Sequence, residues 1–290
     1  MDNNSREIRL KQIQTLLKTA ISLGLSRLDA EVLLAHVLGV TRVYLYSWPE
    51  KKLFEEDSRQ FNSLVERRLS GEPIAYLTGR KEFWSLALEV APSVLIPRPE
   101  TELLVELALK LLPLPQDKKT LNILELGCGS GAIALALASE RPHWQIIATD
   151  ISPAALAIAK KNAENSSLYN IEFYLGDWFQ ALSHLSSLTL FDAIISNPPY
   201  IADNDPHLLN PELSFEPILA LKAGNNGLQD LENIIDHAQD YLLSKAWLLL
   251  EHGYDQAEPV AAFFKAKNYL NIQHYKDLAA VNRVTVGQKP

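Results

Sequence analysis

The sequence predicts an α/β protein: a doubly wound, mostly parallel sheet with an antiparallel pair at its C-terminal end, preceded by a small helical bundle. Residues 6–70 carry apolar side chains at the three- and four-residue spacing of helices. Residues 99–267 alternate short apolar runs with helical stretches, and residues 272–286 hold two short runs with no helix between them. Strands that alternate with helices of this length favour a parallel sheet, because each crossover helix returns the chain in the same direction.

The N-terminal bundle is expected to contain helices that stop at glycines. A first helix in residues 8–24 should end in a left-handed cap at its last residue, a glycine. Ser26 and Asp29 have the spacing of a capping box and should open a second helix over residues 26–39. A further helix is expected at about 55–69.

The chain is expected to have three parts, a helical domain (1–74), a hairpin linker rich in proline (75–98) and the sheet domain (99–290). Pro99 should lie in the first turn of a helix that Pro113 and Pro115 end. Within the sheet domain we expect strands at 122–126, 145–149, 171–175, 191–196, 246–251, 272–276 and 283–286, with helices at 131–140, 153–164, 228–243 and 256–267.

Composition and charge limit the classes of function. The 290 residues are 47% hydrophobic and 21% charged, which is ordinary for a globular protein. Residues 1–85 hold 13 Lys and Arg against 11 Asp and Glu, and the remainder holds 14 against 24, so the chain is acidic and direct DNA binding is not expected.

No membrane segment or secretory signal is expected. The longest apolar run, residues 132–138, is far shorter than the ~20 residues that cross a bilayer. The N-terminus has no apolar stretch after its charges, and the single cysteine, Cys128, allows no internal disulfide. The cytoplasm is therefore the expected location.

A cofactor site is predicted at the carboxyl end of the sheet. The segment 125–131, Glu-Leu-Gly-Cys-Gly-Ser-Gly, joins the first strand to a helix, and its glycines let the backbone approach a ligand at the helix N-terminus. Asp150 ends the second strand, where a carboxylate can accept both ribose hydroxyls of an adenosine. Asp177 and Trp178 end the third strand, where they can bind the adenine amino group and cover its ring.

The glycine loop alone leaves two other interpretations open. The residues Gly127, Gly129 and Ala132 also satisfy the loosened dinucleotide fingerprint, so NAD is possible on this loop, and the glycines can serve a tight turn without any ligand. The thiol of Cys128 is expected to fill space and not to react.

A site for chemistry is predicted beside the cofactor. Asn197-Pro198-Pro199-Tyr200 follows the fourth strand and so reaches the same sheet edge as the glycine loop. The Asn197 amide oxygen and the Pro198 carbonyl can each accept one proton of a target NH₂ group, which points its lone pair at a sulfonium methyl group, while Tyr200 packs on the flat group that carries the nitrogen. Catalysis would rest on positioning and fixed dipoles.

No metal site is expected. The seven histidines have no H-x-x-x-H spacing, and one cysteine cannot form a thiolate site.

These motifs resemble the S-adenosylmethionine-dependent methyltransferases, and further stretches narrow the resemblance. Residues 72–79, 83–84, 95–102, 216–221 and 251–253, with Gly224, Gly227-Leu228 and Arg283-Val284, are similar to the HemK/PrmC family of peptide chain release factor N5-glutamine methyltransferases. The resemblance spans most of residues 71–287. One departure is Ala279-Ala280-Val281, where the family pattern has a glycine-containing turn.

The resemblance implies a seven-stranded sheet of the methyltransferase type and S-adenosyl-L-methionine as cofactor. The reaction would be methylation of the glutamine in the Gly-Gly-Gln loop of bacterial release factors, with residues 1–74 binding the substrate protein. By position, the glutamine would be bound by Asn197, Pro198, Pro199 and Tyr200, and Phe83 and Arg98 would close the pocket. The cofactor residues would be Gly127, Cys128, Gly129, Ser130, Gly131, Asp150, Asp177, Trp178 and Asn197.

Alternatives remain for the substrate and for two of these residues. A ribosomal protein glutamine would suit the same site, as would adenine N6 in DNA, although the chain lacks an apparent basic recognition region. A non-catalytic binding module is disfavoured by the intact cofactor loop and acceptor corner. Phe83 with Trp84 also reads as hairpin core, and Arg98 with Glu100 as an ion pair at a helix start.

Overall fold

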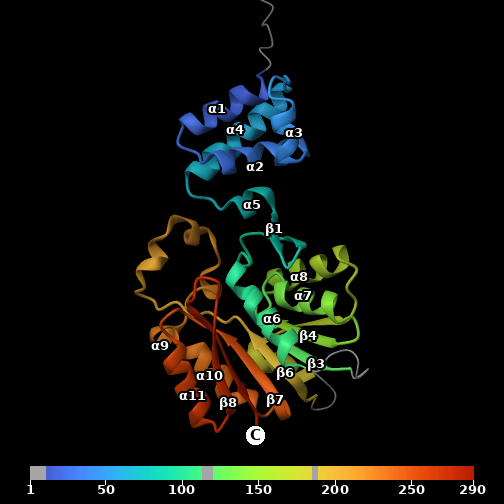
Figure 1. Ribbon diagram of the computed structural model, residues 1–290, viewed down its shortest axis with the longest axis vertical. Coiled ribbons are helices and arrows are strands. Elements are labelled where there is room, and N and C mark those ends of the chain that lie inside the picture. Colours follow the sequence, from blue (N-terminus) through green and yellow to red (C-terminus); the bar gives the residue numbers. More distant parts are fainter. Residues whose placement is uncertain (1–10, 113–119, 185–188) are drawn as a thin grey trace, which may run out of the picture. The chain divides into compact units, whose positions relative to one another are not determined.

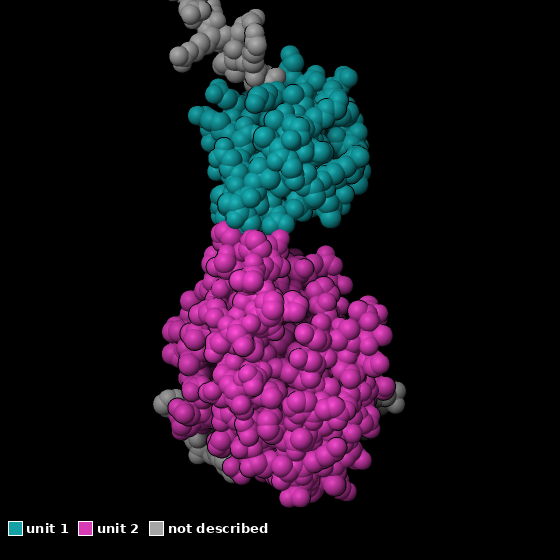
Figure 2. All heavy atoms as spheres, turned by 90° about the vertical axis from the view of Figure 1, so that its left-hand side faces the viewer, with its two compact units in different colours: residues 1–79 teal, residues 80–290 magenta. Residues whose placement is uncertain are grey.

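The computed structural model describes residues 11–112, 120–184 and 189–290. The chain divides into two units, residues 1–79 and 80–290, which Figure 2 colours separately. The sequence placed the end of the helical part at residue 74 and set the hairpin apart as a linker; by its contacts the hairpin belongs to the second unit. No helix in the described part of the chain has the length and apolar character needed to cross a membrane.

The first unit is helical, as the sequence predicts. Ser26 accepts a hydrogen bond from the backbone N–H of Asp29 at 3.0 Å, which caps the second helix, and Gly39 ends that helix in the left-handed conformation. Two short helices, the third and fifth, were not predicted because six and five residues are too few to show a clear apolar period. The helices are α1 (Ile13–Ser22), α2 (Arg27–Leu38), α3 (Arg42–Ser47), α4 (Glu55–Leu69) and α5 (Ile74–Thr78).

The second unit holds a seven-stranded sheet, counted over its described residues, in the order β5-β4-β3-β6-β7-β9-β8. The first five of these strands are parallel, and β9 runs antiparallel to both β7 and β8, which confirms the predicted fold class. The strands are β3 (Asn122–Leu126), β4 (Gln145–Asp150), β5 (Ile171–Leu175), β6 (Phe191–Ser196), β7 (Leu242–Glu251), β8 (Leu270–Lys276) and β9 (Asn282–Gln288).

Helices cover both faces of this sheet (Figure 1). Successive strand residues alternate between two cores: Ile123 belongs to the core beneath α6–α8, whereas Leu124 belongs to the core beneath α10 and α11. This alternation is the period-two geometry of a strand that is buried on both sides. The helices are α6 (Glu102–Leu111), α7 (Ala132–Glu140), α8 (Pro153–Asn165), α10 (Gln229–Ala238) and α11 (Ala257–Ala266).

The segments around the sheet differ from the sequence predictions in detail. Pro99 opens a 3₁₀ turn, η1 (Pro99–Thr101), before α6 begins, and the prolines expected to end that helix lie outside the described residues. Strand β7 begins at Leu242, four residues early, so α10 is shorter than predicted. A small hairpin, β1 (Arg80–Phe83) and β2 (Leu86–Glu89), precedes η1 in the chain.

Four short elements between β6 and α10 were not predicted. They are η4 (Pro206–Leu209), η5 (Pro211–Phe215), η6 (Ile218–Ala220) and α9 (Gly224–Gly227). A further 3₁₀ helix, η3 (Trp178–His184), follows β5.

The last hairpin turns without the glycine that the family pattern suggests. Ala280 itself takes a positive φ of 62°. The Asp277 carboxylate accepts hydrogen bonds from the backbone N–H groups of Ala279 at 2.9 Å and Val281 at 3.0 Å, which stabilises the turn.

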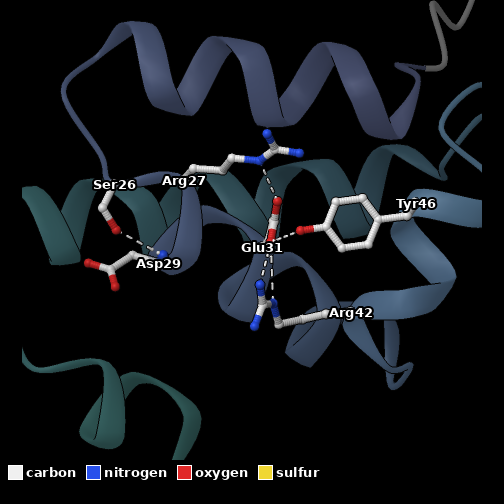
Figure 3. Close-up of polar contacts among 6 residues, drawn as sticks. All are labelled: Ser26, Arg27, Asp29, Glu31, Arg42 and Tyr46. Atoms are coloured by element: carbon white, nitrogen blue, oxygen red, sulfur yellow. Dashed lines mark hydrogen bonds and ion pairs between the residues drawn. The ribbon is translucent and has the colours of Figure 1, made fainter.

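A buried carboxylate joins α2 to α3 in the first unit (Figure 3). The side chain of Glu31 is 2% exposed and accepts hydrogen bonds from Arg27 Nε at 2.8 Å, Arg42 Nη2 at 2.8 Å and the Tyr46 hydroxyl at 2.5 Å. Burial alone would raise the pKa of Glu31, but these hydrogen bonds lower it to about 2. The carboxylate is therefore ionised at neutral pH and fully partnered.

Glu31→Gln should destabilise the helical unit by about 1.5–3 kcal/mol, the usual worth of hydrogen bonds to a charged group. Because the folded-state pKa lies below the ordinary 4.5, the stabilisation is present above pH 4.5 and is lost as the pH falls toward 2. Urea unfolding of the full chain at several pH values measures both effects.

Glu56→Gln is the matched control, because Glu56 pairs with Arg59 at the surface, with side chains 78% and 68% exposed. This control should change stability by less than about 0.5 kcal/mol. Equal losses of unfolding free energy in the two variants would show that the buried Glu31 cluster contributes no more stability than a surface ion pair.

Candidate active site

A hollow of about 320 Å³ lies at the carboxyl ends of β3, β4, β5 and β6 in the second unit. We call it the first hollow. Several residues predicted for the cofactor site line it: Gly127, Gly129, Asp150, Asp177, Trp178 and Asn197, together with Pro199. The other three predicted cofactor residues, Cys128, Ser130 and Gly131, do not line it.

The glycines of the loop after β3 serve different purposes. Gly127, Gly129 and Gly131 have φ values of +69°, +55° and +82°, which L side chains rarely adopt. A Cβ on Gly131 would lie 2.4 Å from Leu135 Cδ1 and 3.2 Å from Ala159 Cβ. The third glycine is thus needed for packing between α7 and α8, whereas the first two bring backbone to the hollow.

Two buried side chains are Cys128, in this loop, and Glu125, in β3. Burial raises the pKa of the Cys128 thiol well above its usual value, which keeps the thiol protonated. Burial also raises the pKa of Glu125 to about 8, and its Oε2 accepts a hydrogen bond from the backbone N–H of Ala134 at 2.9 Å. Glu125 is therefore largely neutral at pH 7 and ties the first turn of α7 to β3.

Asp150 connects the ends of two strands. Its Oδ2 accepts the backbone N–H of Gly129 at 2.8 Å, and its Oδ1 accepts that of Ser152 at 2.8 Å. Burial raises the pKa of Asp150, and these hydrogen bonds lower it. A carboxylate has about four acceptor positions, so Asp150 can still receive hydroxyl groups from the hollow.

The end of β5 brings the Trp178 indole and the Asp177 carboxyl group to the first hollow, and the start of α10 adds a second carboxyl group. The ring of Trp178 lies over Gly127, since a Cβ there would be 3.5 Å from the indole Cζ3. Asp230, at the start of α10, also lines the hollow and was not predicted. Burial and the nearby Asp177 raise its pKa, while a hydrogen bond with Trp178 lowers it.

A second hollow, of about 420 Å³, adjoins the first. Its lining includes Arg98, Pro198, Tyr200 and Arg283. Leu95, Asn197 and Ala220 line both hollows. Asn197 therefore lies where the two spaces meet, at the end of β6.

The corner formed by residues 197–200 is held from behind by side chains that the sequence did not point to. Asn197 Nδ2 donates a hydrogen bond to Thr101 Oγ1 at 3.1 Å. The Tyr200 hydroxyl donates to Glu251 Oε1 at 3.2 Å, and Gln256 Nε2 donates to the Tyr200 carbonyl at 3.0 Å. Burial raises the pKa of the Tyr200 phenol, so it remains a neutral donor.

Arg98 and Phe83, the two residues expected to close the pocket, differ in position. Arg98 lines the second hollow and forms an ion pair with Glu216, not with Glu100. Glu216 also accepts the backbone N–H of Ile96 at 3.0 Å, so the segments before α6 and before α9 are joined. Phe83 is 1% exposed, belongs to the core beneath α6–α8 and lines neither hollow, so the expectation that it closes the pocket is not supported.

Two further segments line the first hollow. Residues 93–95 and 217–222 contribute most of the lining of the first hollow that the site prediction missed, including Lys222. The usable signal was the pair of family-like stretches 95–102 and 216–221, which have no chemical motif of their own. Over the described residues, no group of three His, Cys, Asp or Glu side chains is placed to hold a metal ion.

Gly227→Ala should destabilise the second unit by about 1–3 kcal/mol more than Gly129→Ala. Both glycines have positive φ, which costs an L residue about 1–2 kcal/mol. Only at Gly227 would the new Cβ collide, 2.2 Å from the Tyr200 carbonyl oxygen, whereas nothing lies within 4 Å at Gly129. Urea unfolding checks this difference, and equal losses would contradict the close approach of α9 to the corner.

Comparison with known proteins shows the family to which the chain belongs. Residues 10–79 match the model of the PrmC N-terminal domain, and residues 117–276 match that of a methyltransferase domain. The release factor glutamine methyltransferase of Coxiella burnetii is 50% identical over 96% of this chain and 95% of its own length. The enzyme of Aliivibrio fischeri is 49% identical over 95% of this chain and 97% of its own length. The enzyme of Escherichia coli is 46% identical over 90% of this chain and 92% of its own length.

Solved structures show the same fold at low identity. A methyltransferase from Pyrococcus furiosus has a TM-score of 0.51 and 17% identity, over 79% of this chain and 98% of its own. The T. thermophilus 16S rRNA N2 G1207 methyltransferase in complex with AdoMet and guanosine has a TM-score of 0.52 and 19% identity, over 73% and 50%. From the relatives that match along nearly its whole length, this chain belongs to the family of release factor glutamine methyltransferases and is a methyltransferase enzyme.

Proposed function

We propose that this enzyme transfers the methyl group of S-adenosyl-L-methionine to the side-chain amide nitrogen, N5, of the glutamine in the Gly-Gly-Gln loop of bacterial peptide chain release factors. The observation that carries the proposal is the position of Asn197 between the two hollows. A donor in the first hollow and an amide in the second would meet at this residue. The names of the relatives support a glutamine of a release factor as the substrate.

The lining of the first hollow fits S-adenosylmethionine. The Trp178 indole offers a flat apolar surface for an adenine ring, and the free lone pairs of Asp150 suit the ribose hydroxyls. Asp150, Asp177 and Asp230 face this space with one cation, Lys222, so the surroundings favour a ligand that carries positive charge. The cofactor supplies an electrophilic methyl group on a sulfonium.

The corner at residues 197–200 suits the acceptor. An amide nitrogen is a weak nucleophile because its lone pair is delocalised into the carbonyl group. The Asn197 amide oxygen and the Pro198 carbonyl would each accept one hydrogen of the NH₂ group and so favour the reactive form. The prolines hold these acceptors at fixed φ, so little reorganisation is needed during the reaction.

The substrate is proposed to be a protein and not DNA. The chain is acidic overall, with a formal net charge of −8, whereas duplex binding rests on several Lys and Arg contacts with phosphate. The helical residues 1–74 are proposed to help bind the release factor. Since release factors act in the cytoplasm, the enzyme is expected there.

A labelled-methyl transfer assay tests the substrate. Purified release factor, ribosomal protein and adenine-containing DNA are offered separately, with a release factor whose Gly-Gly-Gln glutamine is changed to alanine as control. Label should enter the intact release factor and be absent from the alanine variant. Label that enters only ribosomal protein or only DNA would overturn the proposed substrate.

Asn197→Ala and Asp150→Ala should separate catalysis from cofactor binding. Asn197→Ala should lower turnover by about 10²-fold or more, because a contact made in the transition state is lost, while the Kd for S-adenosylmethionine changes little. Asp150→Ala should act mainly on that Kd. Calorimetry and steady-state kinetics measure the two effects, and a large loss of cofactor affinity in Asn197→Ala would contradict its assigned role.

A further inference from the structure

The side chain of Thr101 lies behind the acceptor corner, in the 3₁₀ turn that precedes α6. Thr101 is 4% exposed and lines neither hollow. Its Oγ1 accepts a hydrogen bond from Asn197 Nδ2 at 3.1 Å, across 96 residues of sequence. Thr101 thus contacts the NH₂ group of the Asn197 amide. The amide oxygen, the atom of this side chain that can accept a hydrogen bond, is not used in this contact.

The direction of this hydrogen bond depends on where the Thr101 proton goes. A hydroxyl has one proton to donate and two lone pairs that accept. If Thr101 donates its proton elsewhere, its oxygen can only accept, and the Asn197 NH₂ group must face it. The Asn197 oxygen then points the other way and is free for a ligand.

Glu251, at the end of β7, is the acceptor placed to take that proton. Its side chain is 1% exposed. Burial raises the pKa of Glu251 to about 7, against hydrogen bonding from Thr101 and Tyr200, which lowers it. Glu251 Oε1 accepts the Tyr200 hydroxyl at 3.2 Å, whereas Oε2 is buried without a hydrogen-bond partner among the described residues, so it is the atom left to accept the Thr101 proton.

Neighbouring charges act on Glu251 in opposite directions, and its carboxyl keeps acceptor capacity in either protonation state. Arg283, on β9, lowers the pKa of Glu251, whereas Glu100, beside Thr101, raises it. Tyr200 is a neutral donor because burial raises its pKa. Glu251 therefore holds one end of the corner, Tyr200, directly, and acts on Thr101, which contacts the other end, Asn197.

We propose that Thr101 is a positioning residue for methyl transfer: its hydroxyl, oriented by Glu251, turns the Asn197 amide so that its oxygen faces the nitrogen to be methylated. The inference rests on the proposed function for its effect on turnover. The orientation of the amide, by contrast, can be tested without any substrate.

Thr101→Val removes the hydroxyl at nearly constant shape, and Thr101→Ser keeps it. Thr101→Val should lower kcat by about 10-fold to 10²-fold, as expected when a reacting group is misplaced, with the Kd for S-adenosylmethionine unchanged within about twofold. Thr101→Ser should restore most of the turnover. Thr285→Val is the control for loss of a buried hydroxyl, because Thr285 is fully buried and its hydroxyl bonds to His252 and His274 and not to residues 197–200. Its kcat should stay near that of the parent enzyme.

Glu251→Gln tests whether Glu251 orients the Thr101 hydroxyl. We call the path from Glu251 through Thr101 to Asn197 the relay. Glutamine can donate a proton to Thr101, which would free the hydroxyl to donate to Asn197 and reverse the amide. Its kcat should fall as in Thr101→Val, and the double variant should be no slower than either single variant, because the two residues act as one unit. Additive losses would contradict the relay.

The amide orientation is measured directly in ¹⁵N-labelled full-length protein. The side-chain NH₂ signals of Asn197 are assigned by their disappearance in Asn197→Ala. Slow hydrogen exchange of these signals is expected in the parent enzyme and in Thr101→Ser, and fast exchange in Thr101→Val. Unchanged protection in Thr101→Val would overturn the inference whatever the substrate, whereas failure of the parent enzyme to methylate release factor would overturn only the proposed function.

Discussion

The active site depends on one geometric constraint, the convergence of four parallel strand ends at a single edge of the sheet. The glycine loop follows β3, Asp150 ends β4, Asp177 and Trp178 follow β5, and Asn197 follows β6. Hydrogen-bonded register fixes their spacing, and Ser196 Oγ adds a bond to the Leu126 carbonyl at 2.8 Å. The residues proposed to bind the cofactor and the acceptor lie side by side because of this register.

Buried polar groups fix the orientation of the loops and side chains at these strand ends. Glu125 ties α7 to β3, Asp150 braces the glycine loop, and Glu251 holds Tyr200. Each lies in surroundings that disfavour a charged group, and burial raises the pKa of all three. Such networks add little to net stability but restrict the number of conformations available to the corner.

Much of this architecture could be predicted from the sequence, because strand and helix periods and glycine caps are local signals. Strands β3, β5 and β6 have the bounds that were expected, and the two motifs lie at the same sheet edge. What could not be predicted depends on contacts between distant residues. Thr101 and Glu251 reach residues 197–200 from 96 and 51 positions away. Both lie in stretches that resemble the family, 95–102 and 251–253, but neither stretch indicates this contact. For Phe83 the sequence left hairpin core and pocket closure open, because an aromatic residue in a hairpin gives no sign of which side it faces; its burial in the core favours the first.

A crystal structure of the chain with S-adenosylhomocysteine and a peptide containing Gly-Gly-Gln would test the central claim most directly. We expect the cofactor product in the first hollow, with its sulfur near Asn197, and the glutamine amide nitrogen within hydrogen-bond distance of both Asn197 Oδ1 and the Pro198 carbonyl. A glutamine bound away from this corner, or an Asn197 amide that presents its nitrogen to the substrate, would contradict it.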